Sequence, residues 1–171
     1  YKRQLYATAQ PRDRYRIAAQ AAAKLRAVDK ILAHHPQQAL IIGGYVDQLK
    51  ELGAHLDAPV IDGSTSTAKR ERLFQQFRDG SLPVLVVSKV ANFSIDLPEA
   101  ALAIQVSGTF GSRQEEAQRL GRLLRPKEEE ALFYSLVTRD SLDADYAVHR
   151  QRFLAEQGYA YRLIDALDLE Q

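Results

Sequence analysis

Residues 112–126 read SRQEEAQRLGRLLRP, and their pattern predicts a helix that begins and ends within the stretch. Ser112 is a good N-cap and Glu115 stands three residues on, so the two residues form a capping box. Pro126 ends the run, because proline cannot continue a helix. The stretch is therefore expected to form a single helix that is bounded on both sides by its own sequence.

The two sides of this predicted helix carry different chemistry. At roughly 100° per residue, three apolar side chains share one side: Ala117, Leu120 and Leu124. On the opposite side, an amide and two guanidinium groups fall within roughly 60° of each other and form what we call the arginine stripe: Gln118, Arg122 and Arg125. Such a stripe suits an oxyanion such as phosphate. A solvated surface helix is the simpler interpretation, but within the helix the stripe lacks the acidic i+4 partners of a solubilising face.

Composition limits the class of protein. The chain has 171 residues, 46% of them hydrophobic, which fits one domain with a sizeable core. A net charge of +1 provides no global basic field, so any nucleic-acid contact must come from a local patch. The absence of cysteine excludes disulfides and thiolate metal sites, and the four histidines show no zinc spacing. No metal site is predicted.

Membrane and export signals are absent from the sequence. No apolar run approaches the ~20 residues of a membrane span, and no signal peptide is visible. These features favour an intracellular protein without a membrane partner. The chain has no methionine, not even at its start, so we expect a fragment or a processed product of a longer protein.

Short apolar runs alternate with helical patterns along the chain. The runs that read as strands are 40–42, 59–61, 84–87, 102–106 and 132–137. Besides the helix in 112–126, the patterns that read as helices are 13–35, 45–55, 68–78 and 141–157. This alternation predicts a mostly parallel sheet with helices on both faces. We expect buried positions at the strand centres Ile41, Val60, Val86, Ile104 and Phe133.

Polar segments follow four of these strands, at residues 43–45, 62–67, 88–96 and 107–112. Ligands of parallel α/β sheets lie at the carboxyl ends of the strands, so the polar chemistry is expected along one edge. The segment 62–67 offers backbone N–H and hydroxyl donors to a phosphate. On its own, however, it fits a helix N-cap loop better.

The string 118–125, QRLGRLLR, resembles motif VI of superfamily 2 helicases, in the form found in the XPB (xeroderma pigmentosum group B) family. Residues 88–100 are similar to motif V of that family, and residues 40–45 stand where its motif IV is expected. The resemblance covers nearly the whole chain from about residue 36. It is strongest between residues 86 and 126.

The resemblance implies a fold and an activity. The XPB family consists of ATP-dependent DNA helicases and translocases with 3′→5′ polarity that act in nucleotide excision repair. Their motor has two RecA-like domains, and this chain looks like the second, a three-layer α/β/α domain of the P-loop NTPase type. On that basis, 13–165 is the helicase C-terminal domain, 1–12 an entry linker and 166–171 a tail. Pro126 replaces the small residue that usually follows the last arginine of motif VI, and we interpret this as the prokaryotic form of the family. A prokaryotic member would be a cytoplasmic, nucleoid-associated protein.

The resemblance also implies roles for single residues. The arginine fingers, and hence the catalytic groups, would be Arg122 and Arg125. The ATP-binding residues would be Gln118, Asp96 and Gly121. The residues that would face DNA or couple it to ATP are Ser88, Lys89, Asn92 and the 107–112 loop. Two loop ends are expected to meet DNA phosphates as well, at Gly44, Tyr45, Gly63, Ser64 and Thr65.

Two motifs that ATP hydrolysis needs are missing from the chain, the GxxxxGK[ST] phosphate loop and the DExH/D box for magnesium. The chain is therefore expected to supply half of a composite site, with ATP and Mg²⁺ bound mainly by the N-terminal RecA-like domain of the same protein. The expected partners are DNA, that domain, and a repair nuclease or other repair proteins. Two alternatives stay open: a non-catalytic nucleic-acid-binding module of the same fold, and an unrelated α/β nucleotide-binding enzyme. A GxGxxG fingerprint, which would favour the latter, follows no strand.

Overall fold

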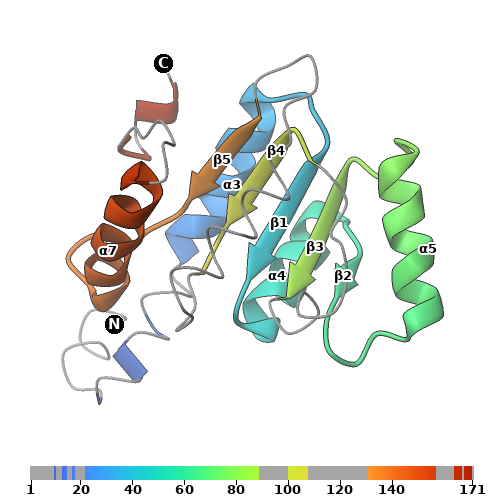
Figure 1. Cartoon of the computed structure of the whole chain (residues 1–171), viewed down its shortest axis with the longest axis horizontal. Coiled ribbons are helices and arrows are strands. Elements are labelled where there is room, and N and C mark those ends of the chain that lie inside the picture. Colours follow the sequence, from blue (N-terminus) through green and yellow to red (C-terminus); the bar gives the residue numbers. More distant parts are fainter. Residues whose placement is uncertain are drawn as a thin grey trace.

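A parallel sheet forms the centre of the chain (Figure 1). The computed structural model describes residues 10, 13–14, 17, 22–88, 100–107, 131–156, 164–166 and 168–170. The strands are β1 (Ala39–Gly43), β2 (Val60–Ile61), β3 (Val84–Ser88), β4 (Leu102–Gln105) and β5 (Leu132–Ser135). They are ordered β2-β3-β1-β4-β5, and every neighbouring pair is parallel. The predicted five-stranded parallel sheet is confirmed.

The strands in the middle of the sheet are apolar on both faces. All five residues of β1 are buried, and its Ile41 lies opposite Val86 of β3 and Ile104 of β4. Continuous apolar runs are typical of parallel strands that helices cover on both sides. The prediction of full burial is wrong for Val60 and Phe133, which are half-buried. Both lie in the outer strands of the described sheet, where one flank lacks a neighbouring strand.

Helices pack on both faces of the sheet (Figure 1). The helices α3 (Ala22–His34) and α4 (Val46–Leu56) cover the face that carries Ile41, and they bury Val28, Ile31, Leu49 and Leu52 there. On the other face, α5 (Thr67–Arg78) buries Leu73, Phe74 and Phe77 against apolar residues of β1, β2 and β3. The three-layer α/β/α arrangement predicted for the chain is confirmed.

The described residues after β5 form two further helical elements. There, α7 spans Leu142–Glu156 and the short 3-10 helix η2 spans Asp168–Glu170. Leu169 of η2 packs against the core cluster beneath α3, and Lys30 Nζ of α3 donates to the Ala166 carbonyl at 3.4 Å. Arg139 forms an ion pair with Asp165. The described part of the predicted tail therefore lies against α3.

Candidate nucleic-acid interface

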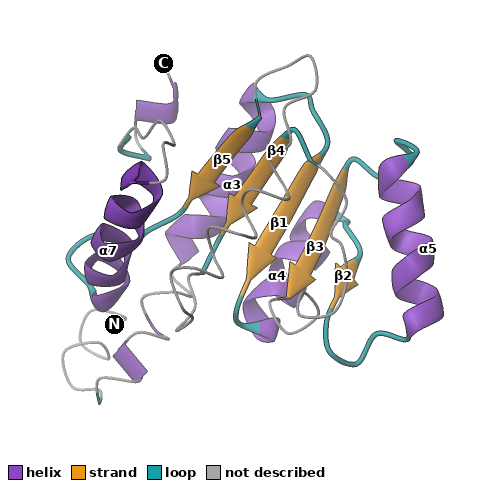
Figure 2. Cartoon of the chain, in the orientation of Figure 1, coloured by secondary structure: helices purple, strands orange, loops and turns teal. Residues whose placement is uncertain are grey.

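The predicted DNA contacts that the structure describes gather along one edge of the sheet. The arrowheads of β1, β3, β4 and β5 point the same way, toward the carboxyl edge (Figure 2). Gly44 and Tyr45 follow β1, Gly63 to Thr65 follow β2, and Ser88 ends β3. Because these strands are neighbours in the sheet, the structure brings the predicted residues together at that edge, as the sequence indicates.

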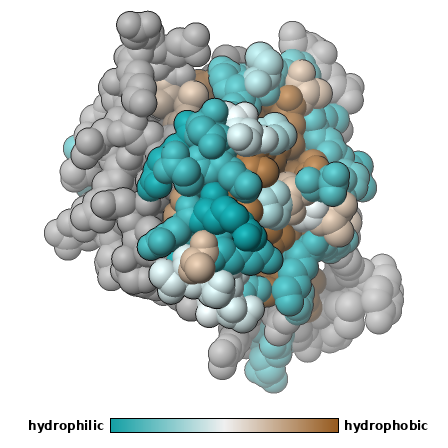
Figure 3. Space-filling model, turned by 90° about the vertical axis from the view of Figure 1, so that its right-hand side faces the viewer, coloured by the Kyte–Doolittle hydropathy of each residue, from teal (hydrophilic) through white to brown (hydrophobic). Residues whose placement is uncertain are grey.

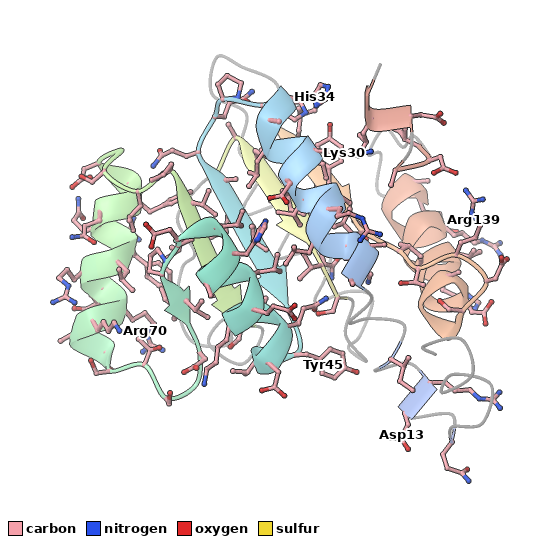
Figure 4. The ribbon with its side chains drawn as sticks, turned by 180° about the vertical axis from the view of Figure 1, so that it is seen from behind. Asp13, Lys30, His34, Tyr45, Arg70 and Arg139 are labelled. Atoms are coloured by element: carbon pink, nitrogen blue, oxygen red, sulfur yellow. The ribbon has the colours of Figure 1, made fainter. Side chains whose placement is uncertain are left out.

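The turn from β1 into α4 is tightly packed. The Gly44 N–H donates to Ser107 Oγ at 2.7 Å, which ties this turn to the end of β4. A Cβ on Gly43 would lie 2.8 Å from Leu49 Cδ2 and 3.0 Å from Ser107 Oγ, so a side chain here would have to displace the end of Leu49. Tyr45 is the N-cap of α4 without a side-chain capping bond, and its ring lies at the start of the helix (Figure 4).

The loop after β2 is held by a carboxylate. Asp62 Oδ1 accepts from the Ser64 N–H at 2.8 Å and from the Ser64 hydroxyl at 2.6 Å. The Thr65 hydroxyl accepts from the Asp62 N–H at 3.0 Å. The hydrogen bond from the Ser64 hydroxyl, more than any other contact, lowers the pKa of Asp62 below its usual value of 3.8. Several donors that were candidates for phosphate are therefore already engaged with Asp62.

The same loop caps α5. Ser66 has an extended backbone, and its hydroxyl accepts from the Lys69 N–H at 3.2 Å, the usual geometry of a helix N-cap. The structure therefore bears out the N-cap interpretation of the loop 62–67. A phosphate at Ser64 would have to compete with the carboxylate of Asp62 for the same donors.

Ser88 occupies the end of β3, which lies between β2 and β1 in the sheet. Its side chain is only 1% exposed, and within the described part of the chain its Oγ has no hydrogen-bond partner. Buried polar groups without a partner are uncommon in proteins and call for an explanation. A DNA contact through this hydroxyl requires that the atoms covering it move aside.

Two buried side chains meet the end of β4: Lys24, which the sequence interpretation did not single out, and Ser107, which begins the predicted polar segment 107–112. Lys24 of α3 is 5% exposed, and its Nζ donates to the Val106 carbonyl at 2.7 Å. Ser107, which accepts from Gly44, is 1% exposed. The sequence did contain a signal that Lys24 is buried. Lys24 shares a helix face with the core residues Val28 and Ile31, which follow it at i+4 and i+7.

A further cation lies at the start of α5. Arg70 is half-buried and occupies the first turn of the helix, at the carboxyl edge of the sheet (Figure 4). Its Nε is shielded from solvent and has no hydrogen-bond partner among the described residues. The surface over α5 is largely hydrophilic (Figure 3). Arg70 could be found in the sequence only by placing it on the same helix face as Phe74 and Phe77.

The other predicted site residues lie outside the described residues: Lys89, Asn92, Asp96, Gln118, Gly121, Arg122 and Arg125. The predictions for the arginine stripe and the ATP-binding residues are therefore untested by the geometry. Within the described ranges, no cluster of three or more acidic, histidine or cysteine side chains has the arrangement of a metal site. None of the described helices is both long and apolar enough to span a membrane.

Comparison with known proteins identifies relatives of the chain. The family model for the ERCC3/RAD25/XPB C-terminal helicase matches residues 1–171. The DNA 3′-5′ helicase XPB of Mycobacterium tuberculosis is 67% identical over 98% of this chain and 31% of its own length. The general transcription and DNA repair factor IIH helicase/translocase subunit XPB of Drosophila melanogaster is 40% identical over 84% of the chain and 19% of its own length. The chain thus spans less than a third of either relative.

Solved structures resemble the fold at lower sequence identity. The C-terminal domain of the DEAD-box protein Dbp5 superimposes with a TM-score of 0.67 and 18% identity, covering 81% of this chain and 82% of that domain. The C-terminal part of the Fun30 ATPase domain gives a TM-score of 0.61 and 22% identity, covering 86% of this chain and 49% of that one. These likenesses support a RecA-like fold.

Proposed function

The chain belongs to the ERCC3/RAD25/XPB C-terminal helicase family, and from that premise we propose that it is the second motor domain of an ATP-dependent 3′→5′ DNA helicase or translocase. The observation that carries the proposal is the family match along the whole chain, from residue 1 to residue 171. Its bacterial relative in Mycobacterium tuberculosis is named a DNA 3′-5′ helicase. The parallel sheet with polar loops at its carboxyl edge suits this role, because such sheets bind ligands there.

The proposed motor divides its chemistry between two domains. The sequence has neither a phosphate loop nor a DExH/D box, so ATP and Mg²⁺ would be held mainly by the N-terminal RecA-like domain of the same protein. This chain would add Arg122 and Arg125 as arginine fingers, with Gln118, Gly121 and Asp96 as further nucleotide contacts. Guanidinium groups stabilise the charge that spreads over the phosphoryl oxygens in the transition state.

DNA would run along the carboxyl edge of the sheet. The proposed contacts are Gly44, Tyr45, Gly63, Ser64, Thr65, Ser88, Lys89 and Asn92. They would hold phosphates, to which N–H, hydroxyl and ammonium groups donate without reading the sequence. Arg70 adds a guanidinium at the same edge, and this charge would favour a phosphate there.

The biological setting is proposed from the relatives. The Drosophila relative is named as a subunit of a general transcription and DNA repair factor. For this chain we propose a role in DNA repair of the nucleotide-excision type, with a repair nuclease or other repair proteins as partners. A nucleoid-associated location in a prokaryotic cytoplasm would follow from that role.

The arginine fingers provide the sharpest test of this function. In the complete protein with DNA, Arg122→Ala or Arg125→Ala should lower the kcat of ATP hydrolysis by about 10³- to 10⁵-fold. Arg→Lys at either position should rescue poorly, because an ammonium lacks the planar fork. The measurement is steady-state ATP turnover, with thermal melts to establish that each variant folds.

Arg119→Ala is the matched control, because on an ideal helix Arg119 lies roughly 100° from Gln118 and off the arginine stripe. It should harm turnover less than the two stripe variants. Normal turnover by folded Arg122→Ala and Arg125→Ala proteins would refute the finger assignment. Tight DNA binding by a complete protein that hydrolyses no ATP would favour the non-catalytic module instead.

A further inference from the structure

We propose that the solvent side of α5 is a second contact surface for DNA, which holds phosphates of a duplex beside the carboxyl edge of the sheet. The inference rests on the proposed function, because it adds a surface to the DNA path of that motor. Three side chains of α5 build the surface, and we call them the α5 stripe: Lys69, Arg72 and Gln76. None of them is among the contacts that the sequence predicts.

The α5 stripe runs along one side of its helix. Arg72 and Gln76 follow Lys69 at i+3 and i+7, so at roughly 100° per residue the three side chains fall within roughly 60° of one another. Lys69 and Arg72 are exposed, and Gln76 is half-buried. The surface over α5 is largely hydrophilic (Figure 3). The helix therefore presents two cations and an amide to the solvent in a single row.

The cations of the α5 stripe lack the acidic neighbours of a solubilising helix face. Among the described residues, neither Lys69 nor Arg72 forms an ion pair. The only acidic residue of α5 is Glu71, which falls roughly 100° or more from both cations on an ideal helix. Lys69 and Arg72 themselves stand at i and i+3, where like charges repel each other. Ion pairing within the described chain therefore leaves both charges uncompensated.

The position of these cations opposes the stability of the helix. A helix begins at the positive end of its dipole, where acidic side chains stabilise it and basic side chains do not. The first turn of α5 holds no acidic residue, and Lys69 is the third residue of the helix. Local features that conflict with folding are expected at functional sites. An anion bound over the stripe would turn this repulsion into attraction.

The place of the stripe in the fold favours DNA as that anion. α5 begins at the carboxyl edge of the sheet and runs back toward the opposite edge (Figure 1). The Lys69 N–H donates to the Ser66 hydroxyl at 3.2 Å, so the first cation follows directly on the loop that is proposed to meet DNA at residues 63–65. A phosphate backbone at this loop can continue onto the stripe. An acidic protein segment would lack this continuity.

The chemistry of the surface favours a duplex over a single strand. Surfaces that bind single strands combine cations with exposed aromatic rings, on which the bases stack. Both aromatic residues of α5, Phe74 and Phe77, are 1% exposed and belong to the core. Duplex DNA presents one negative charge per about 1.7 Å of its axis, which is twice the charge density of one strand. Long cationic side chains on a helix surface can meet these phosphates without reading the sequence.

The test compares the binding of the complete protein to a duplex and to a single strand of the same length. Each phosphate contact on a duplex contributes about −0.9 to the slope of log K against log salt concentration, so Lys69→Gln/Arg72→Gln should reduce the size of that slope by about two. From about 50 to about 200 mM salt, the wild type should lose about tenfold more duplex affinity than this variant does. Its single-strand affinity should change less than about twofold. Fluorescence anisotropy would measure both substrates.

Gln76→Lys tests the same surface by adding a cation to it. The new ammonium extends the stripe, so the size of the duplex slope should rise by about one. Thermal melts separate this role from a structural one. Lys69→Gln/Arg72→Gln should melt at or above the Tm of the wild type, because it removes a cation from the first turn and a like-charge pair. Residues that merely support the fold would instead lower the Tm and leave the slopes unchanged.

Arg26→Gln/Arg78→Gln is the matched control, because it removes the same charge from exposed positions of α3 and α5. Arg78 falls roughly 120° or more from every member of the stripe on an ideal helix. This control should keep the wild-type duplex slope, and an equal loss in it would refute the inference by reducing the effect to net charge.

The outcomes distinguish this inference from the proposed function. If the wild type hydrolyses ATP and binds DNA while the stripe variants keep its duplex slope, the inference is wrong and the proposed function stands. Binding of polyglutamate that Lys69→Gln/Arg72→Gln weakens, with an unchanged duplex slope, would assign the stripe to an acidic protein instead. A wild type that hydrolyses no ATP and binds neither form of DNA would overturn both.

Discussion

Asp62 shows how a single side chain sets the chemistry of a loop. Its carboxylate accepts from both the N–H and the hydroxyl of Ser64, and this arrangement turns the chain from β2 toward the N-cap of α5. The same carboxylate places a negative charge at the edge where DNA phosphates are proposed to lie. Asp62 therefore stabilises the loop and at the same time repels the proposed ligand.

Replacing Asp62 by asparagine should separate these two effects. In Asp62→Asn the repulsion is gone, so DNA affinity of the complete protein should rise about threefold at low salt and less at high salt. The pKa of Asp62 is lowered in the folded state, so its stabilisation is complete above about pH 4 and is lost as the pH falls further. The variant should therefore show a smaller loss of Tm below pH 4 than the wild type does. DNA titrations and melts across pH 2.5–6 would measure both.

Asp79 provides the control at the opposite end of α5. It accepts from the N–H of Ser81, and the hydroxyl of Ser81 is the main cause that lowers its pKa as well. Asp79→Asn should thus alter acid stability in the same direction while leaving DNA affinity unchanged. Equal DNA affinity of Asp62→Asn and the wild type would show that DNA does not approach the loop after β2.

At the scale of elements, α4 depends on a glycine in its interior. A Cβ on Gly53 would lie 2.3 Å from Val60 Cγ2 and 2.9 Å from the Ala58 carbonyl oxygen. The Gly53 carbonyl accepts from the N–H of Asp57, which has a left-handed conformation, and from the N–H of Ala58. The glycine therefore lets the chain reverse directly from α4 into β2.

Gly53→Ala should destabilise the domain, although alanine is the better helix former. The gain in helix propensity is about 1 kcal/mol, whereas the clash with backbone at Ala58 and with Val60 should cost more, about 2–4 kcal/mol. Chemical denaturation should give a net loss of about 1–3 kcal/mol in the free energy of unfolding. Ala54→Gly, on the exposed side of the same helix, should lose about 1 kcal/mol for propensity alone. A stabilised Gly53→Ala protein would contradict this packing argument.

At the scale of the whole molecule, the sequence predicted the secondary-structure elements that leave a periodic pattern of apolar residues. The five strands and the helices α4, α5 and α7 were placed to within a few residues, because apolar runs such as 84–87 and helical spacing such as that of Leu73, Phe74 and Phe77 are local patterns. The predicted helix 13–35 is described as a helix from Ala22 to His34, and the helix predicted within 112–126 lies outside the described residues. The contacts of Lys24 and Ser107 could not be predicted in the same way. They depend on Val106 and Gly44, which lie 82 and 63 residues away along the chain. Half-burial of Val60 and Phe133 also follows from strand order, which a local pattern does not contain.

Because the proposed motor is divided between two domains, we make a last prediction for this chain expressed alone. It should hydrolyse no ATP with or without DNA, because the phosphate loop and the magnesium ligands are missing from its sequence.

Its DNA binding should be weak and sensitive to salt, because few cations face the proposed path. Each phosphate contact contributes about −0.7 to −0.9 to the slope of log K against log salt concentration, so about three contacts should give a slope of about −2 to −3. Arg70→Gln should reduce the size of that slope by about one, since Arg70 stands at the carboxyl edge in the first turn of α5. Arg78→Gln, in the last turn of the same helix, is exposed at the opposite edge and should leave the slope unchanged. Fluorescence anisotropy at a series of salt concentrations would measure all three proteins. Equal slopes for Arg70→Gln and Arg78→Gln, or tight sequence-specific binding at physiological salt, would place the DNA elsewhere on the molecule.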